Sequence, residues 1–182
     1  MHRKYCEKIA AFDLDGTLYK DNSHIEILCM YYNTIFFKSI FFVALGKISS
    51  KIQLKIMDFM YERIPHTVRE NFILEFSPKI LRLLKKKTDM GYYPVILSSA
   101  PFDLIKGAAE YLKIDFCKCI AGKKNEALLQ RYKYNRLFVC TDNKTDVNLI
   151  NLADEAVITA PQKHRDYFVE KIRGVNYIFI DI

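Results

Sequence analysis

Short apolar runs alternate with segments of helical periodicity over most of the chain. The apolar runs predict buried strands, at residues 9–12, 93–97, 115–120, 136–141, 156–159 and 176–182. The segments between them predict helices, at 78–90, 102–112, 122–134, 145–153 and 162–172, with Ser77 and Thr145 as N-caps. Strands that alternate with helices form βαβ units, so we expect an α/β fold with a doubly wound parallel sheet.

Residues 20–75 interrupt this alternation. A very apolar segment covers 25–48, and a second one, with apolar positions close to a helical period, runs from 52 to 64 and ends at Pro65. A third short helix is expected near 68–76. The expected organisation is a small helical cap at 20–75, inserted into a core formed by residues 1–19 and 76–182.

The first apolar segment of the cap has about the length needed to span a bilayer. Asn33 and Lys38 near its middle argue against a span, because a lysine at mid-bilayer costs roughly 3 kcal/mol or more. The favoured interpretation is a buried cap helix. The alternatives are a true span and an interfacial membrane-docking surface, on which Lys38, Lys47, Lys51 and Lys55 would suit anionic lipids.

Two aspartates one residue apart follow the first predicted strand. Positions i and i+2 of a strand share a face, so Asp13 and Asp15 start out pointing the same way, and Gly16 lets the chain turn. Open α/β sheets bind ligands at this carboxyl end of their strands. Adjacent carboxylates repel each other unless a cation separates them, and Mg2+ suits oxygen ligands. A calcium-binding EF-hand loop is excluded because its twelfth position, here His24, has to be glutamate.

Composition narrows the choice of partners. The chain has 182 residues and a net charge of +7, which suits phosphorylated metabolites, anionic membranes or nucleic acid. The absence of an arginine-rich stripe with interleaved aromatic residues disfavours nucleic acid. The five cysteines are odd in number and scattered, so we expect reduced packing residues. Because no signal-peptide pattern is visible, we expect a cytoplasmic protein, or one bound peripherally at the inner face of the membrane.

Further polar residues fall where the predicted sheet would present its active edge. Ser98 ends one predicted strand, Asp142 follows another, and Asp146 lies one helical turn later. Lys124 stands near the start of a predicted helix. Each of these residues alone is typical of an ordinary turn, cap or surface position. Their order along the chain, after Asp13 and Asp15, is what indicates a site.

These residues resemble the motifs of phosphatases of the haloacid dehalogenase superfamily. Residues 12–18 (FDLDGTL) match the first motif, 95–98 (VILS) the second and 139–146 (VCTDNKTD) the fourth. Lys124 best matches the third motif, with Lys123 as the alternative. The fourth motif departs from the family pattern in one respect, since Thr141 stands where a glycine is common. A helical cap between the first two motifs is similar to that of the group containing phosphoserine phosphatase.

The resemblance implies a Mg2+-dependent phosphatase that forms an aspartyl-phosphate. Asp13 would be the nucleophile, and Asp15 would protonate the leaving oxygen and then deprotonate the hydrolytic water. Mg2+ would be held by Asp13, the backbone carbonyl of Asp15, and Asp142. The implied phosphate ligands are Thr17, Ser98, Ser99 and Lys124, with backbone N–H groups of Leu14 and Ser99 as further donors. Asp146 would bind the metal through water or orient Lys124.

The same resemblance bears on the substrate. Dehalogenases of the superfamily lack the second aspartate, so the presence of Asp15 favours phosphoryl transfer. Residues 19–24 do not reproduce the glutamate-bearing segment typical of phosphoserine phosphatases. The apolar, aromatic cap is similar to those of lipid-directed relatives, which favours a lipid-linked or membrane-surface phosphate. The alternatives are a soluble-metabolite phosphatase or phosphotransferase of the same family, and a membrane- or protein-docking module with vestigial activity.

Overall fold

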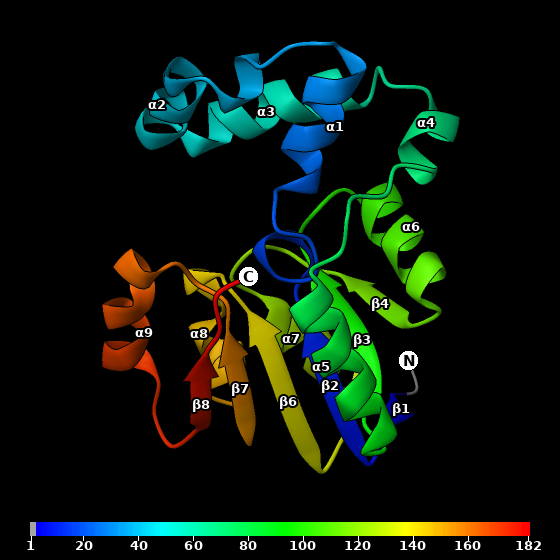
Figure 1. The fold of residues 1–182 in the computed structure, drawn as a ribbon, viewed down its shortest axis with the longest axis vertical. Coiled ribbons are helices and arrows are strands. Elements are labelled where there is room, and N and C mark those ends of the chain that lie inside the picture. The colour runs from blue at the N-terminus through cyan, green and yellow to red at the C-terminus, as the bar shows by residue number, and fades with distance from the viewer. Residues whose placement is uncertain (1–2) are drawn as a thin grey trace.

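The computed structural model describes residues 3–182, so the first two residues of the predicted core segment 1–19 lie outside it. Its centre is a six-stranded parallel sheet in the order β4-β3-β2-β6-β7-β8 (Figure 1). The strands are β2 (Lys8–Phe12), β3 (Tyr93–Ser98), β4 (Asp115–Lys118), β6 (Arg136–Thr141), β7 (Glu155–Ile158) and β8 (Asn176–Phe179). The predicted α/β fold with a parallel sheet is therefore confirmed.

Helices cover both faces of the sheet because its inner strands are apolar on both sides. One face packs Ile9 and Val139 against α7 (Lys124–Arg131), α8 (Val147–Ile150) and α9 (Arg165–Lys171). The other packs Phe12 and Phe138 against α5 (Pro78–Asp89) and α6 (Phe102–Leu112). Successive residues of β2 thus point into two different hydrophobic clusters, which explains why residues 9–12 read as an uninterrupted apolar run.

The first strand of the large sheet lies at its centre. From β2 the chain adds β3 and β4 on one side, and then β6, β7 and β8 on the other. The strand order therefore reverses at β2, and a crevice forms there beyond the carboxyl ends of β2, β3 and β6. Asp13 is the first residue after β2, so the topology alone places it in this crevice.

Several predicted boundaries in the core differ from the structure. The strands expected over 115–120 and 176–182 end at Lys118 and Phe179, and the helix expected over 162–172 is a 3-10 turn (Gln162–His164) followed by α9. The helix expected over 122–134 ends at Arg131, because residues 132–133 form a two-residue strand, β5 (Tyr132–Lys133), that pairs with β1 (Lys4–Tyr5). The expected N-cap Thr145 is itself capped, since its backbone N–H donates to the Asn143 side chain over 3.0 Å. The helix that follows is a short 3-10 turn (Lys144–Asp146) leading into α8.

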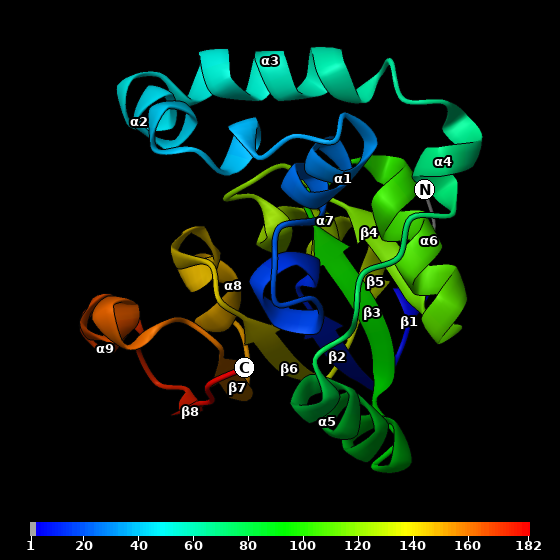
Figure 2. The same ribbon diagram turned by 45° about the horizontal axis from the view of Figure 1, so that its top comes forward.

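Four helices lie beyond the crevice, between Tyr19 and Phe76, which pair with each other in an isolated antiparallel bridge. The helices are α1 (Ser23–Tyr31), α2 (Ile40–Ile48), α3 (Ser50–Tyr61) and α4 (His66–Glu70). Figures 1 and 2 show this cap above the carboxyl edge of the sheet, with α2 at its far end from α4. The third expected cap helix, near 68–76, is α4 and begins two residues earlier.

The long apolar segment 25–48 is not one helix. It breaks after α1 at Asn33, whose φ of 47° is left-handed, passes through a 3-10 turn (Phe36–Lys38), and restarts at α2 with Ser39 as N-cap. Its buried members, such as Ile27, Phe37 and Phe42, form a small core with Met57 of α3. Within residues 3–182, no helix combines the length and the apolar character that crossing a membrane requires.

Candidate active site

A pocket of about 360 Å³ opens at the carboxyl ends of β2, β3 and β6. It lies at the reversal of strand order, where α/β sheets bind their ligands. It is lined by Asp13, Asp15, Gly16, Lys20, Asp21, Asn22, Ser98, Ser99, Asp142 and Asn143. Five residues singled out from the sequence, drawn from three separate strand ends, therefore meet in one cavity.

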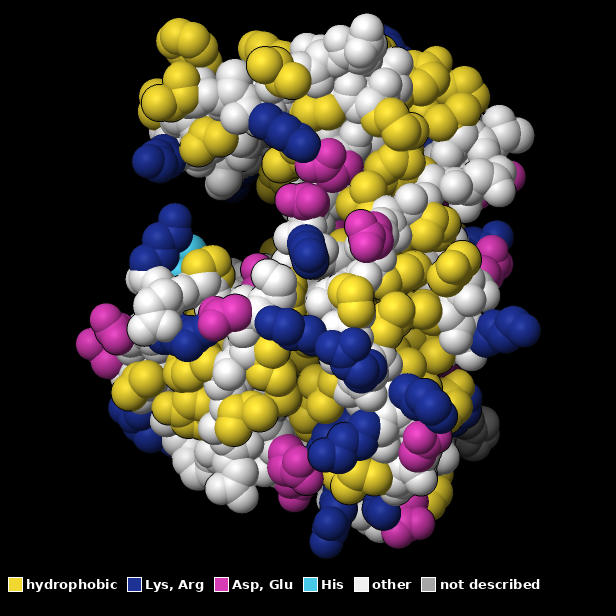
Figure 3. All heavy atoms as spheres, in the orientation of Figure 1, with side chains coloured by type: hydrophobic (Ala, Val, Ile, Leu, Met, Phe, Trp, Pro, Cys, Tyr) yellow, Lys and Arg dark blue, Asp and Glu magenta, His cyan; other side chains and the backbone are white. Residues whose placement is uncertain are grey.

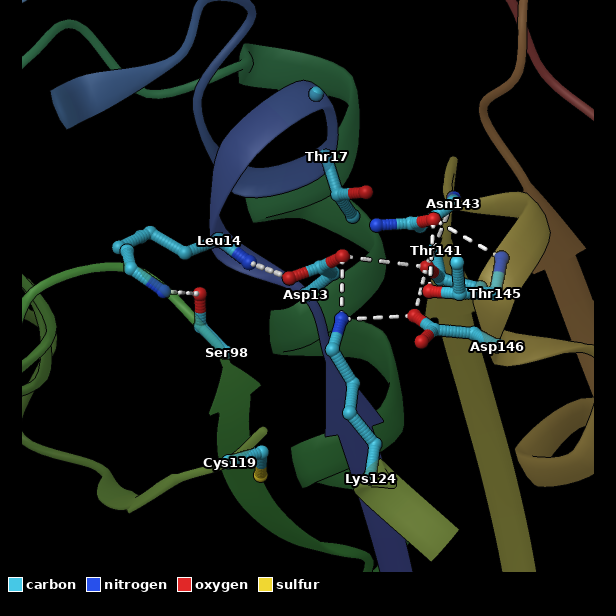
Figure 4. Close-up of polar contacts among 12 residues, drawn as sticks. Asp13, Leu14, Thr17, Ser98, Cys119, Lys124, Thr141, Asn143, Thr145 and Asp146 are labelled. Carbon is cyan, nitrogen blue, oxygen red and sulfur yellow. Dashed lines mark hydrogen bonds and ion pairs between the residues drawn. The ribbon is translucent and has the colours of Figure 1, made fainter. Parts of the chain in front are cut away.

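Asp13 lies at the floor of this pocket and is only 7% exposed. One carboxylate oxygen accepts a hydrogen bond from the backbone N–H of Leu14 over 2.8 Å. The other lies 2.5 Å from the Lys124 Nζ and 3.3 Å from the Thr141 hydroxyl (Figure 4). Burial raises the pKa of Asp13, while Lys124 opposes that shift. With donors on both oxygens, the carboxylate is held in place and its anionic form is stabilised.

Lys124 is 3% exposed and lies between two carboxylates. Its Nζ is 2.5 Å from Asp13 and 2.7 Å from Asp146. Burial alone would lower the pKa of Lys124, but the two neighbouring carboxylates raise it above its ordinary value. Lys123, the alternative, is exposed and lies 3.9 Å from Glu126. The geometry therefore selects Lys124, and it places Asp146 against that lysine, one of the two roles expected for it.

Asp15 projects from the turn that follows Asp13. Its carboxylate accepts a hydrogen bond from the backbone N–H of Ser23, the first residue of α1, over 2.8 Å. Burial raises the pKa of Asp15 to about 6, although the Ser23 hydrogen bond opposes the shift. A carboxyl group with a pKa near 6 can both give and take a proton at neutral pH. The contact with Ser23 also ties this group directly to the cap.

Asp142 borders the same pocket from the end of β6. A methyl group added at Gly16 would lie 2.3 Å from the Asp142 carboxylate, and Gly16 also has a left-handed φ of +67°. Only glycine fits both constraints. The turn of the first motif therefore packs closely against Asp142 of the fourth motif. Burial and the nearby charge of Asp13 raise the pKa of Asp142 to about 7.

This donor set fits a hard cation. Asp13 and Asp142 line the pocket and would supply carboxylate oxygens, and the expected third ligand is the backbone carbonyl of Asp15. Burial and the neighbouring charge of Asp13 raise the pKa of Asp142, and a divalent ion between the two carboxylates would offset both effects. Across residues 3–182, no three His, Cys, Asp or Glu side chains gather as a metal cluster. The predicted set calls for only two side chains, because its third ligand is a main-chain oxygen.

The expected phosphate ligands divide into two groups. Ser98 and Ser99 line the pocket, and the Ser98 hydroxyl accepts a hydrogen bond from the backbone N–H of Ala100 over 3.1 Å. Thr17 does not line it: its side chain is fully buried and its hydroxyl lies 3.1 Å from that of Thr159. The expected phosphate contact of Thr17 is corrected accordingly, because this side chain holds the turn against the strand end of β7. The Leu14 N–H, also an expected phosphate donor, is already bonded to Asp13.

Sequence reasoning missed two parts of the site. Lys20, Asp21 and Asn22 line the pocket, although the sequence predicted no role for them in the site. The Thr141 hydroxyl donates to the Asp146 carboxylate over 2.7 Å and accepts from the backbone N–H of Asn143 over 3.2 Å. Position 141 holds threonine where the family commonly has glycine. This departure was the one signal in the sequence that could have pointed to the contacts of Thr141.

A larger cavity of about 720 Å³ adjoins the first, and Ser99 borders both. It lies between α3 and the loops that follow β3 and β4. Its lining is mixed: Leu54, Phe102 and Ile120 are apolar, and the charged residues are Asp58, Glu62, Arg69, Asp103 and Lys118. His24 reaches it from the cap, is 6% exposed, and has no hydrogen-bond partner at Nε2. Burial lowers the pKa of His24 to about 4. The two cavities together form a cleft between cap and core.

No protein-family model and no curated protein sequence matches the chain. Solved structures do match. A HAD family hydrolase from Salmonella enterica superposes with a TM-score of 0.67 at 16% identity, over 96% of this chain and 68% of that one. A phosphoserine phosphatase from T. onnurineus gives 0.58 at 14% identity, over 100% and 92%. A haloacid dehalogenase-like hydrolase from Streptococcus pneumoniae gives 0.58 at 15% identity, over 95% and 93%. The chain therefore has the fold of the haloacid dehalogenase-like hydrolases, as its sequence motifs predict.

Proposed function

We propose that the protein is a Mg2+-dependent phosphatase that hydrolyses a phosphomonoester through an aspartyl-phosphate on Asp13. The observation that carries the proposal is the buried group of Asp13, Lys124 and Asp146 under a pocket bordered by Asp15 and Asp142. It combines a fixed carboxylate nucleophile, a buried cation and a second carboxyl group with a raised pKa. Few structural roles require these three features in one cavity.

Asp13 is the proposed nucleophile. Its carboxylate oxygen attacks phosphorus, a new P–O bond to Asp13 forms, and the ester P–O bond to the leaving alcohol breaks. Lys124 and the Leu14 N–H hold the carboxylate oriented toward the pocket. Ser98 and Ser99, which line the pocket, would bind the phosphoryl oxygens together with Lys124, which lies beneath the pocket against Asp13.

Asp15 is the proposed acid and base. In the first half-reaction its proton goes to the leaving alkoxide, and in the second it accepts a proton from the water that attacks the aspartyl-phosphate. Inorganic phosphate then leaves and both carboxyl groups return to their starting states. A pKa of about 6 suits this alternation, since neither form of Asp15 is strongly favoured near neutral pH.

Asp13, Asp142 and the carbonyl of Asp15 would hold Mg2+, whose charge offsets that of the phosphoryl group. The chain's own contribution is to fix both carboxylates before a substrate arrives. Asp13 is held by the Leu14 N–H and the Lys124 ammonium, and Asp142 packs against the turn at Gly16, where there is no room for a Cβ. Hydrolysis is then expected to require a divalent ion with a preference for oxygen ligands.

The alcohol part of the substrate would occupy the cleft beneath the cap. Leu54, Phe102 and Ile120 in the larger cavity, and the exposed apolar residues of α2 elsewhere on the cap, support an alcohol that carries a long acyl or polyprenyl chain. A soluble phosphorylated metabolite is the competing substrate. The two are separated by kcat/KM for long-chain against short-chain phosphomonoesters, assayed in the same mixed detergent micelles. A ratio near one would contradict the lipid-linked substrate.

The central test is hydrolysis of an aryl phosphate with and without Mg2+. We expect activity that depends on the metal and falls by at least about 1,000-fold in Asp13→Asn, because the amide is not a nucleophile. Asp15→Asn supplies the matched comparison. It should lose far less activity on aryl phosphates, whose leaving groups need no proton, than on alkyl phosphates. Undiminished activity of Asp13→Asn would contradict the proposed intermediate.

A further inference from the structure

The cap presents an apolar and basic surface to solvent. Residues 27–57 contain four lysines and no aspartate or glutamate. Phe41 is 80% exposed and Ile48 85%, and Ile40 and Ile52 beside them are also largely exposed. Figure 3 shows hydrophobic side chains gathered on this part of the cap around α2. We propose that the outward surface of α2 and the first half of α3 binds an anionic lipid membrane.

The exposure follows from how α2 is held. Phe42 is the only buried side chain of this nine-residue helix. The Gln53 side chain of α3 donates a hydrogen bond to the Phe42 carbonyl over 2.9 Å, and Gly46 gives that side chain its room. One face of α2 is thereby fixed on α3, with Leu45 partly buried against the cap core, while Ile40, Phe41, Val43 and Ile48 are exposed. An apolar surface on a rigid support costs little ordering when it inserts among lipids.

The charge of this surface specifies the occupant. Lys38 is paired with Glu26 at 2.6 Å, but within residues 3–182 no salt bridge involves Lys47, Lys51 or Lys55. Lysines beside inserted apolar residues lie at the depth of lipid headgroups, where each contributes about 1 kcal/mol on anionic membranes. A second copy of the chain fits less well, since it would bring the same lysines and no acidic side chain from this segment.

Figure 3 shows the molecule hollowed between the part of the cap that carries α2 and the part of the core that carries α9. No residue of α2 lines either cavity of the cleft. Membrane binding uses none of the residues of the catalytic pocket, so it can be tested independently of the proposed phosphatase activity.

The test is co-sedimentation of the full chain with vesicles, in the absence of substrate. Phosphatidylcholine vesicles are compared with phosphatidylcholine containing phosphatidylglycerol. We expect at least tenfold stronger partitioning onto the anionic vesicles, weakened by raised salt. Phe41→Asp should reduce it at least tenfold, as should Lys47→Glu combined with Lys51→Glu. All variants should keep the circular dichroism spectrum and the Mg2+-dependent hydrolysis of a soluble aryl phosphate.

Two matched variants control for added negative charge. Val169→Asp changes an exposed apolar residue of α9, and Lys86→Glu combined with Lys171→Glu reverses two exposed lysines elsewhere; both should bind like the wild type. Equal loss in controls and cap variants would overturn the docking surface, as would no binding of the wild type to anionic vesicles. A dimer in analytical ultracentrifugation that Phe41→Asp abolishes, without vesicle binding, would overturn it in favour of self-association.

Discussion

The hydroxyl of Thr141 donates a hydrogen bond to the carboxylate of Asp146 over 2.7 Å. The same oxygen of Asp146 accepts from Lys124, which in turn contacts Asp13. Thr141 itself is buried and is not among the residues that line the pocket. It therefore acts as a positioning residue, through Asp146 and Lys124 and through its own 3.3 Å contact with the Asp13 carboxylate.

Replacing Thr141 by valine removes this hydrogen bond at nearly constant volume. We expect Thr141→Val to lower kcat roughly tenfold, the effect of losing one hydrogen bond to a charged group, and to leave KM nearly unchanged. Thr141→Ser should restore most of the activity. Thr88→Val, at an exposed position of α5, controls for the loss of a hydroxyl. Steady-state kinetics decides the matter, and a change confined to KM would rule out the positioning role.

The two adjacent lysines should differ sharply in their effect on stability. Lys124→Ala leaves the buried carboxylates of Asp13 and Asp146 without their cation, so we expect a loss of about 3 kcal/mol in the free energy of unfolding at neutral pH. Lys123→Ala removes only an exposed contact and should change it by less than about 0.5 kcal/mol. Urea unfolding measures both. Similar losses for the two variants would show that the buried contacts of Lys124 contribute no more than a surface pair.

A comparison of the alanine variants of Gly16 and Gly91 separates the effect of backbone strain from the effect of displacing a neighbouring side chain. Both have a left-handed φ, but an added methyl at Gly91 meets nothing within 4 Å, whereas at Gly16 it meets the Asp142 carboxylate. Both alanine variants should lose about 1 kcal/mol of stability. Only Gly16→Ala should also lose activity, by about 100-fold, because it shifts a proposed metal ligand. Thermal unfolding and kcat/KM test the two effects separately, and full activity of Gly16→Ala would contradict the metal role of Asp142.

His24 should make folding sensitive to pH. Its pKa is near 6.5 in the unfolded chain and about 4 in the folded protein, because burial disfavours the charged ring. The unfolded state therefore binds the proton first. The contribution of His24 to stability is intact above pH 6.5 and is lost as the pH falls toward 4, by at most about 3 kcal/mol.

The difference in unfolding free energy between wild type and His24→Gln isolates this contribution from that of the buried aspartates. We expect the difference to favour the wild type more strongly at pH 7.5 than at pH 4.5, as measured by urea unfolding at each pH. Parallel pH profiles for the two proteins would mean that the His24 ring is not desolvated in the cleft.

The sequence predicted the bounds of an element correctly where the segment itself contains a complete apolar pattern. The helix 102–112 and the strand 136–141 have the bounds that the sequence predicts, since each shows a complete apolar pattern between clear ends. The pairing of β1 with β5 was missed, because two residues are too few to show a period. The N-cap at Asn143 was missed because Thr145, two residues later, has an equally suitable side chain.

The sequence by itself determined the fold class and the set of residues that carry the proposed chemistry. Apart from Lys124, which begins a helix, those residues lie at or directly after the ends of apolar runs, and in a parallel sheet such positions converge at one edge. Tertiary structure decided three further points. Lys124 and not Lys123 contacts Asp13, the Thr17 side chain contacts Thr159 and not the pocket, and Thr141 contacts Asp146. Tertiary structure also decided which face of α2 is exposed to solvent. Each depends on which side chain fills a given space after distant segments pack together, and no periodicity along the chain records that.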